Sequence, residues 1–204
     1  TFTGSTGGLL ALLTGEADLA GCHLDGGVDA GPDADPIQRL LPGRALSVVT
    51  LARRQQGLIV PPGNPGRIER VEDLTRHGLV LALRQAGSGT RRLLEEALAH
   101  VSASMDLSQH PVFTTHAAVA AAVAQGTADV GLGILAAART YGLDFIPLTW
   151  EPYDLVIPLE YRQTEGILAA LEILRSPSFL AVMSALGGYD TSVTGQERVI
   201  QPRI

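Results

Sequence analysis

The stretches TGSTGGLLALLTGEADLAG (residues 3–21) and TTHAAVAAAVAQGTADVGL (residues 114–132) resemble each other at a constant offset of 111 positions. Each one reads as a hydroxyl-bearing loop, an apolar helix, a glycine that ends the helix, and Ala-Asp at the start of a buried strand. Gly15 matches Gly126 in this alignment. Two unrelated helix–strand units would also share a glycine after the helix. The repeated Gly-x-Ala-Asp spacing nevertheless favours two similar lobes in one chain.

Around these stretches, apolar runs of strand length alternate with segments of helical period, which predicts a mainly parallel sheet covered by helices. Two long β-rich runs, residues 45–65 and 143–159, are predicted to cross between the lobes. This organisation assigns residues 1–50 and 152–204 to lobe I, and residues 51–151 to lobe II. The predicted strands are residues 17–22, 47–52, 57–60, 79–83, 129–134, 145–148 and 154–158, and the predicted helices are residues 7–13, 71–76, 90–101, 117–124, 135–141, 165–174 and 178–185.

The composition is that of a globular protein, because 46% of the 204 residues are hydrophobic and only 18% are charged. A net charge of −6 gives no overall attraction to nucleic acid or to anionic lipid. All 15 basic residues are arginine, which excludes lysine Schiff-base chemistry and a phosphate-loop lysine. The single cysteine, Cys22, cannot form an intramolecular disulfide and is expected in the core.

No apolar run is long enough to span a membrane, and no signal peptide is visible. We therefore expect a cytoplasmic protein without membrane insertion. The chain starts at Thr1 rather than at Met, so a periplasmic or cell-surface location is the alternative if an export signal has been removed.

The sharpest local feature is LVLALRQAGSGTRRLLEEALAHV (residues 79–101), in which a buried strand, a Gly-rich turn and an amphipathic helix follow one another. A helix N-terminus favours an anion because its first N–H groups are unpaired and carry partial positive charge. The alternative is an ordinary capped helix, since Ser-Gly-Thr is also a common cap. The loop lacks the lysine of a Walker loop and the third glycine of a dinucleotide fingerprint. The candidate anion-binding residues of this segment are Arg84, Gly87, Ser88, Gly89, Thr90 and Arg91.

Two other predicted helix starts carry the same chemistry: GSTGG (residues 4–8) and TTHAA (residues 114–118). They add Ser5, Thr6 and Thr115 to the candidate site. If the two lobes face one another, three helix N-termini converge on one cleft. Such a cleft would hold a tetrahedral oxyanion largely by neutral donors, with arginine completing the charge balance.

Catalytic and metal sites are poorly supported by the sequence. Ser5, Ser88, His23 and His116 supply the residue types of a nucleophile and a base, but no Gly-x-Ser-x-Gly elbow lies at a strand-to-helix turn. His23 with Asp25 is a possible metal-binding pair, yet no further ligand completes it. We therefore expect neither catalysis, nor a metal, nor a cofactor.

Four segments resemble the periplasmic-binding-protein-like domain described as the LysR-type or molybdopterin-biosynthesis-associated substrate-binding domain. The resemblance implies a two-lobed type II solute-binding fold of class α/β, with two crossover strands as a hinge and a ligand in the cleft. Members of this family are similar to molybdate- and tungstate-binding proteins. The resemblance therefore implies anion contacts at Ser5 and Thr6, Arg84, Ser88 to Thr90, and Thr115. The four segments are GSTGGLLALLTGEADLAGCHL (residues 4–24), VEDLTRHGLVLALRQAGSGTRRLLE (71–95), THAAVAAAVAQGTADVGLGI (115–134) and GGYDTSVTGQ (187–196).

Together these features predict a non-catalytic sensor domain that closes on an oxyanion such as molybdate or tungstate. The resemblance implies an upstream helix-turn-helix or molybdopterin-synthesis domain as a possible partner, which this chain does not contain. One alternative is an extracytoplasmic solute-binding component of an ABC transporter. Another is an enzyme or enzyme-associated domain that acts on a small anion.

Overall fold

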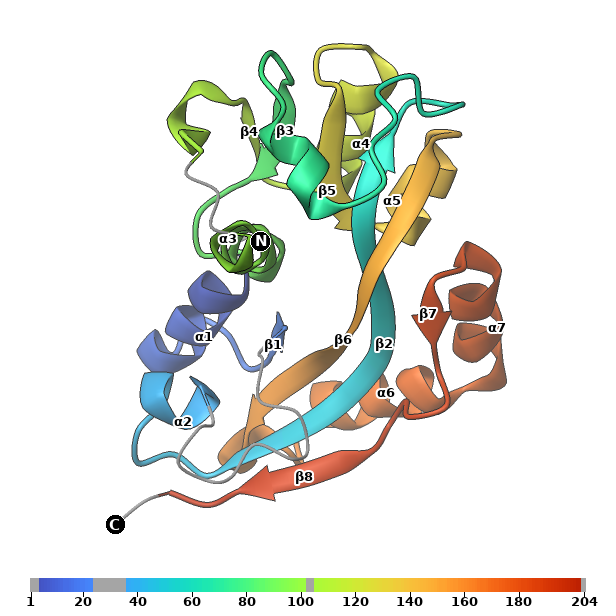
Figure 1. Ribbon diagram of the computed structural model, residues 1–204. Coiled ribbons are helices and arrows are strands. Elements are labelled where there is room, and N and C mark those ends of the chain that lie inside the picture. Colours follow the sequence, from blue (N-terminus) through green and yellow to red (C-terminus); the bar gives the residue numbers. More distant parts are fainter. Residues whose placement is uncertain (1–3, 24–35, 102–104, 203–204) are drawn as a thin grey trace. The chain divides into compact units, whose positions relative to one another are not determined.

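The computed structural model describes residues 4–23, 36–101 and 105–202, which form two compact α/β units (Figure 1). We call Gln55–Trp150 the inserted unit, and residues 4–54 with 151–202 the terminal unit. Two long strands, β2 (Leu46–Val60) and β6 (Asp144–Pro158), each contribute one part to either unit.

In the inserted unit, three shorter strands extend the sheet from β2 in the order β2–β5–β3–β4. β5 pairs antiparallel with β2, whereas β3 pairs parallel with both β4 and β5. Two apolar clusters cover this sheet: Leu58 and Leu83 pack with Leu94 of α3, and Ile59 and Ala82 pack with α4 and α5. The elements are η2 (Val71–Thr75), β3 (Leu81–Arg84), α3 (Gly89–His100), η3 (Leu107–Gln109), β4 (Val112–Phe113), α4 (His116–Ala124), β5 (Val130–Ile134) and α5 (Leu135–Thr140).

The carboxyl ends of β3, β4 and β5 define one edge of the inserted unit. Because these strands are parallel and each precedes a helix, α3, α4 and α5 all begin at this edge. In open α/β sheets, ligands bind outside the carboxyl ends of the strands. We call this edge of the inserted unit the carboxyl edge.

The terminal unit is built around the remaining parts of β2 and β6. β1 pairs antiparallel with β6, while β7 and β8 pair antiparallel with β2. Leu9 and Leu12 of the first helix pack against Leu46 and Val156 in its core. Its other elements are α1 (Gly4–Thr14), β1 (Ala20–Cys22), α2 (Pro36–Leu40), η4 (Leu159–Tyr161), α6 (Glu165–Arg175), α7 (Pro177–Leu186), β7 (Tyr189–Asp190) and β8 (Glu197–Ile200).

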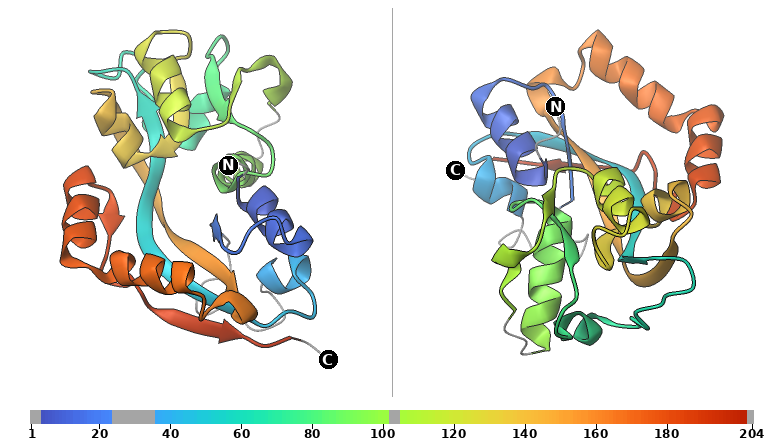
Figure 2. Two further views of the ribbon diagram at one scale, coloured as in Figure 1. Left: turned by 180° about the vertical axis from the view of Figure 1, so that it is seen from behind. Right: turned by 90° about the horizontal axis from the view of Figure 1, so that it is seen from above.

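Helices α6 and α7 follow one another closely along the chain (Figure 2). Within the described residues no single helix is long and apolar enough to cross a membrane. These two helices satisfy that criterion only as a pair, and they are bent by 60° where they meet.

The sequence repeat is a structural repeat of helix ends. The carbonyl of Ala11 accepts the N–H groups of Glu16 and Ala17 at 2.8 and 3.2 Å, at the end of α1. The carbonyl of Ala122 accepts those of residues 127 and 128 at 3.0 and 3.3 Å, at the end of α4. Gly15 and Gly126 provide the left-handed backbone of each turn, with φ of 74° and 69°. The repeat predicted from the sequence is therefore confirmed in these hydrogen bonds.

Two strand predictions were wrong. The separate strands expected at 47–52 and 57–60 form one strand, β2, and those expected at 145–148 and 154–158 form another, β6. The polar residues Arg53 to Gln56 interrupt the apolar pattern of β2, but the backbone stays extended through them. Pro147 and Pro152 indicate a break in β6 from the sequence, yet the strand continues through both. The sheet is also mixed rather than mainly parallel, since β2 and β6 bring antiparallel neighbours. The sequence reading missed α2, β4, β7 and β8, which are only two to five residues long.

Candidate functional site

Arg84 ends β3 at the carboxyl edge and is only 8% exposed. Its Nε donates to the side-chain oxygen of Gln85 at 3.1 Å, and its Nη2 donates to the carbonyl of Thr114 at 2.9 Å. Gln85 is tied to the same place, because its N–H donates to the carbonyl of Phe113 at 3.0 Å. The guanidinium is thereby held next to the turns that lead into α3 and α4.

Ser88 is the N-cap of α3. Its hydroxyl accepts the N–H of Arg91 at 3.2 Å and donates to the carbonyl of Gln85 at 2.9 Å. The hydroxyl proton is therefore used within the turn, as in an ordinary cap. The first N–H groups of the helix, at Gly89 and Thr90, have no intrahelical acceptor and are the donors that an anion would meet.

Gly87 and Arg91 have more local roles. Gly87 has a φ of 79°, a left-handed conformation that allows the tight turn between β3 and α3. Arg91 forms an ion pair with Glu95, with Nε to Oε1 at 2.6 Å, one helical turn further on. Its charge is thus compensated within α3.

Thr115 is the N-cap of α4, and its Oγ1 accepts the N–H of Ala118 at 3.0 Å. Together with Arg84 and Ser88 it lies at the carboxyl edge of the inserted unit. The structure therefore brings together the candidate residues predicted between positions 84 and 115. The other two, Ser5 and Thr6, lie in the first turn of α1 in the terminal unit. The convergence of all three helix starts on one cleft stays a prediction.

A polar cluster in the terminal unit, in which His23 and Glu151 are buried, was not predicted from the sequence. It consists of His23, Arg54, Glu151 and Tyr153. The carboxylate of Glu151 contacts Nε of Arg54 through one oxygen, and lies 2.9 Å from Nε2 of His23 through the other. The guanidinium of Arg54 stacks over the ring of Tyr153, 4.4 Å from its centroid. Arginine stacked on an aromatic face is stabilised by a cation–π interaction.

The ring of His23 lies between two oxygen atoms. Its Nδ1 lies 3.0 Å from the carbonyl oxygen of Pro152, which can only accept, so Nδ1 carries a proton. Its Nε2 lies 2.9 Å from a carboxylate oxygen of Glu151. The carboxylate of Glu151 therefore lies between the side chains of His23 and Arg54.

Two nearby groups complete this cluster. The N–H of His23 donates to Oγ of Ser5 at 3.1 Å, which links the cluster to the start of α1. Burial raises the pKa of the Tyr189 phenol, although the positive charge of Arg54 opposes that rise. Tyr189 is therefore a neutral hydrogen-bonding group at physiological pH.

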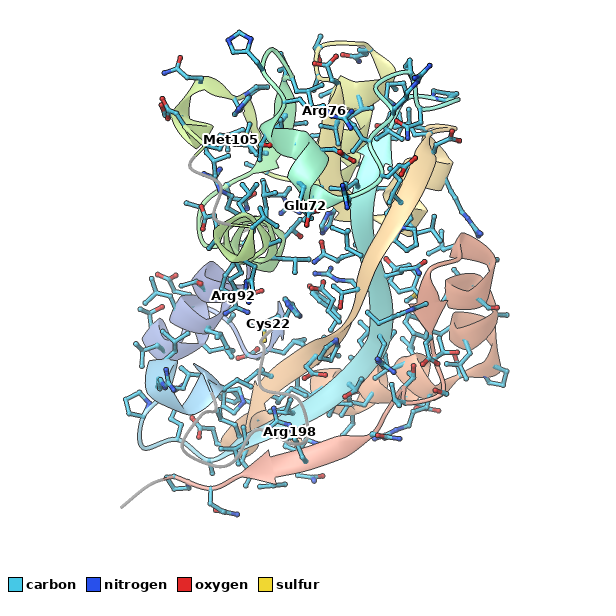
Figure 3. All side chains as sticks on the ribbon, viewed as in Figure 1. Cys22, Glu72, Arg76, Arg92, Met105 and Arg198 are labelled. Atoms are coloured by element: carbon cyan, nitrogen blue, oxygen red, sulfur yellow. The ribbon has the colours of Figure 1, made fainter. Side chains whose placement is uncertain are left out.

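The residues that sequence reasoning missed are polar side chains inside the two long strands. Arg54 and Gln56 lie in β2, and Glu151 lies in β6. The available signal is RRQQ (residues 53–56) within an otherwise apolar run, and the apolar pattern alone predicts a gap between two strands there. Cys22, labelled in Figure 3, is buried in the core of the terminal unit as predicted.

The described residues contain no group of three or more His, Cys, Asp or Glu side chains that could hold a metal ion. Asp25, the proposed metal partner of His23, lies outside the described residues. His23 itself is engaged with Glu151 and Pro152.

A family model described as the PBP superfamily domain matches residues 1–175. The chain is 34% identical over 198 residues to the uncharacterized protein YvgK of Bacillus subtilis (strain 168), covering 96% of the chain and 63% of that relative. It is also 39% identical over 83 residues to an uncharacterized protein encoded 5' of a 2Fe-2S ferredoxin gene in Clostridium pasteurianum, covering 40% of the chain and 74% of that protein. The chain thus spans less than two thirds of the first relative.

Solved structures share the fold at low sequence identity. A substrate-binding protein of Clostridium perfringens with bound phosphate matches 92% of this chain and 84% of its own, with a TM-score of 0.62 and 14% identity. The tungstate ABC transporter protein of Geobacter sulfurreducens matches 87% of this chain and 80% of its own, with a TM-score of 0.59 and 12% identity. These likenesses confirm the two-lobed periplasmic-binding-protein-like α/β fold that the sequence predicted.

Proposed function

The chain belongs to the PBP superfamily, and on that premise we propose that it is a non-catalytic binding protein for a small oxyanion such as molybdate or tungstate. A small-ligand-binding role agrees with the fold, since the similar solved structures are described as substrate-binding and transport proteins. The step to an oxyanion rests on the chemistry of the candidate residues.

Arg84 is the observation that carries the proposal. It is a buried guanidinium held by Gln85 and Thr114 beside the starts of α3 and α4. A fixed arginine fork together with helix N-terminal N–H groups is the donor set that matches a tetrahedral anion. Because the donors are already held by Ser88 and Thr115 caps, little conformational entropy is lost on binding.

The proposal names both a ligand and a biological role. Molybdate or tungstate follows from the sequence resemblance, and one structural neighbour is described as a tungstate ABC transporter protein, whereas others are described with phosphate. We propose a cytoplasmic sensor that acts through a helix-turn-helix or molybdopterin-synthesis module. The alternative role is the binding component of an ABC transporter, which is how the phosphate and tungstate neighbours are described.

A thermal-unfolding panel tests the proposal. The chain is heated with molybdate, tungstate, sulfate, phosphate or small carboxylates. A ligand present at 100 times its dissociation constant is expected to add about 2.7 kcal/mol to the free energy of unfolding. Stabilisation by a carboxylate or another organic ligand and by none of the oxyanions would show that the assignment is wrong.

A further inference from the structure

Arg54 of β2 presents more hydrogen-bond donors than the fold uses. Its Nε contacts the carboxylate of Glu151, and its guanidinium lies over the ring of Tyr153, 4.4 Å from the centroid. An arginine side chain carries five N–H groups, four of them on the two terminal nitrogen atoms Nη1 and Nη2. No hydrogen bond or ion pair joins these two atoms to a residue that the structure describes. One edge of the guanidinium is therefore available to a ligand.

The contacts of Arg54 hold this edge in one orientation. The carboxylate of Glu151 fixes Nε and the stacked ring of Tyr153 fixes the plane, so little side-chain entropy is left to lose on binding. The Arg54 side chain is 13% exposed, so it is not closed off from solvent. Both oxygens of Glu151 are already occupied, one by Arg54 and the other by His23. Two parallel N–H groups held in this way match two oxygens of an oxyanion.

Tyr189 adds a neutral donor on the same face of the sheet. Arg54 and Tyr189 pair directly across β2 and β7, so their Cβ atoms lie about 5 Å apart on one face. Burial raises the pKa of the Tyr189 phenol, and the nearby charge of Arg54 opposes that rise. The phenol thus keeps its proton at neutral pH, and no described residue accepts it.

The start of α1 is connected to the same residues. Oγ of Ser5 accepts the N–H of His23 at 3.1 Å, and the ring of His23 lies 2.9 Å from Glu151, which orients Arg54. A hydroxyl that accepts one hydrogen bond still has its own proton to donate. Ser5, which the sequence predicts to contact an anion, is therefore joined to Arg54 through His23 and Glu151 within the terminal unit.

We infer that Arg54 and Tyr189 form an anion-binding group of the terminal unit, which contacts an oxyanion such as molybdate or tungstate. Nη1 and Nη2 of Arg54 donate to two of its oxygens, and the phenol of Tyr189 donates to a third. Glu151 and Tyr153 do not touch the anion, but position the guanidinium. This inference rests on the proposed oxyanion function.

Removing the hydroxyl of Tyr189 tests the neutral donor. Calorimetry measures the dissociation constants of molybdate, tungstate, sulfate and phosphate for the 204-residue chain and its Tyr189→Phe variant. The variant is expected to bind each anion that the unaltered chain binds about tenfold more weakly, because a hydrogen bond to a charged group is lost. Its melting temperature without ligand should not fall. Tyr161→Phe removes a hydroxyl in η4 of the same unit, outside this group, and should leave the dissociation constants unchanged.

Replacing Arg54 with Lys tests the guanidinium. The lysine keeps a positive charge beside Glu151, but its single ammonium group does not offer a planar edge with two parallel donors. Binding is expected to weaken by about tenfold or more, while thermal unfolding without ligand stays cooperative. Arg53→Lys makes the same change at the preceding residue of β2, where the exposed side chain lies on the opposite face. This control should keep the original affinity.

The outcomes separate this inference from the proposed function. If the unaltered chain binds none of the four anions, the oxyanion function itself is wrong. If it binds one of them, and Tyr189→Phe and Arg54→Lys both bind it as tightly, the function stands and the role assigned to Arg54 and Tyr189 is wrong. Equal weakening by the two control variants would also contradict that role. Should Arg54→Lys fail to fold, Arg54→Met combined with Glu151→Gln removes the guanidinium together with its counter-charge, and the same loss of affinity is expected.

Discussion

Nε2 of His23 lies 2.9 Å from a carboxylate oxygen of Glu151, and both side chains are only 3% exposed. The first residue directly follows β1 and the second lies in the middle of β6, far apart in the sequence. Glu151 also contacts Arg54, so its carboxylate provides the counter-charge of Arg54 in the terminal unit.

Replacing Glu151 with Gln is expected to lower the free energy of unfolding by about 2 to 4 kcal/mol at pH 7, because it leaves the largely buried Arg54 without its counter-charge. Urea unfolding measures this change. Glu172→Gln alters an exposed residue of α6 and should change stability by less than about 0.5 kcal/mol. The double change Arg54→Met with Glu151→Gln should recover part of the loss. An E151Q variant as stable as the original chain would contradict the assigned charge balance.

Replacing Arg84 with Ala is expected to abolish stabilisation by whichever oxyanion stabilises the original chain. The reason is that the variant loses the buried guanidinium at the carboxyl edge. Thermal unfolding with and without the anion measures the effect. Arg139→Ala removes an exposed arginine near the end of α5, away from the starts of the helices, and should leave the ligand response unchanged. Retained anion affinity in R84A would place the site elsewhere.

The stability of the terminal unit should depend on pH through Glu197. Hydrogen bonds from Arg162, at 2.8 and 2.9 Å, and from Ser47, at 2.6 Å, lower the pKa of Glu197 to about 2. Because the folded-state pKa is the lower one, the unfolded chain takes up this proton first as the pH falls. The stabilisation is complete above the unfolded pKa of about 4.5 and is lost between there and pH 2.

Glu197→Gln is therefore expected to cost on the order of 2 kcal/mol at pH 7 and progressively less as the pH falls toward 2. Denaturant unfolding at a series of pH values measures the difference between the two chains. Glu165→Gln, at an exposed position of α6, is the control and should give a difference that is small at every pH. A Glu197→Gln effect that stays constant between pH 5 and 2 would rule out this linkage.

The two helix-ending glycines of the repeat should respond alike to substitution. Gly15 and Gly126 both have positive φ, and a Cβ added at either would meet no atom within 4 Å. Alanine at each position is thus expected to destabilise by about 1 to 2 kcal/mol through backbone strain alone. Gly166→Ala, also in open space but without a positive φ, should instead stabilise α6 by about 0.5 to 1 kcal/mol. Thermal unfolding of the three variants checks this contrast, and a neutral Gly126→Ala would contradict it.

Much of the local structure could be predicted from the sequence, because it is encoded by neighbouring residues. The period of apolar residues and the glycines at 15 and 126 located α1 and α4, and the Ser-Gly-Thr turn located the start of α3. The short elements β4 and β7 were missed because two residues carry no periodic signal.

The sequence by itself thus determined the α/β class, the repeated helix ends and the position of Arg84 before a helix N-terminus. All of these depend on contacts within a few residues along the chain. Only the tertiary structure decided that Glu151 meets Arg54 and His23, and that Gln56 lies buried at the carboxyl edge. Polar residues in a strand look the same in sequence whether they face solvent or the interior. Strand pairing across about 100 residues of chain decides which they face.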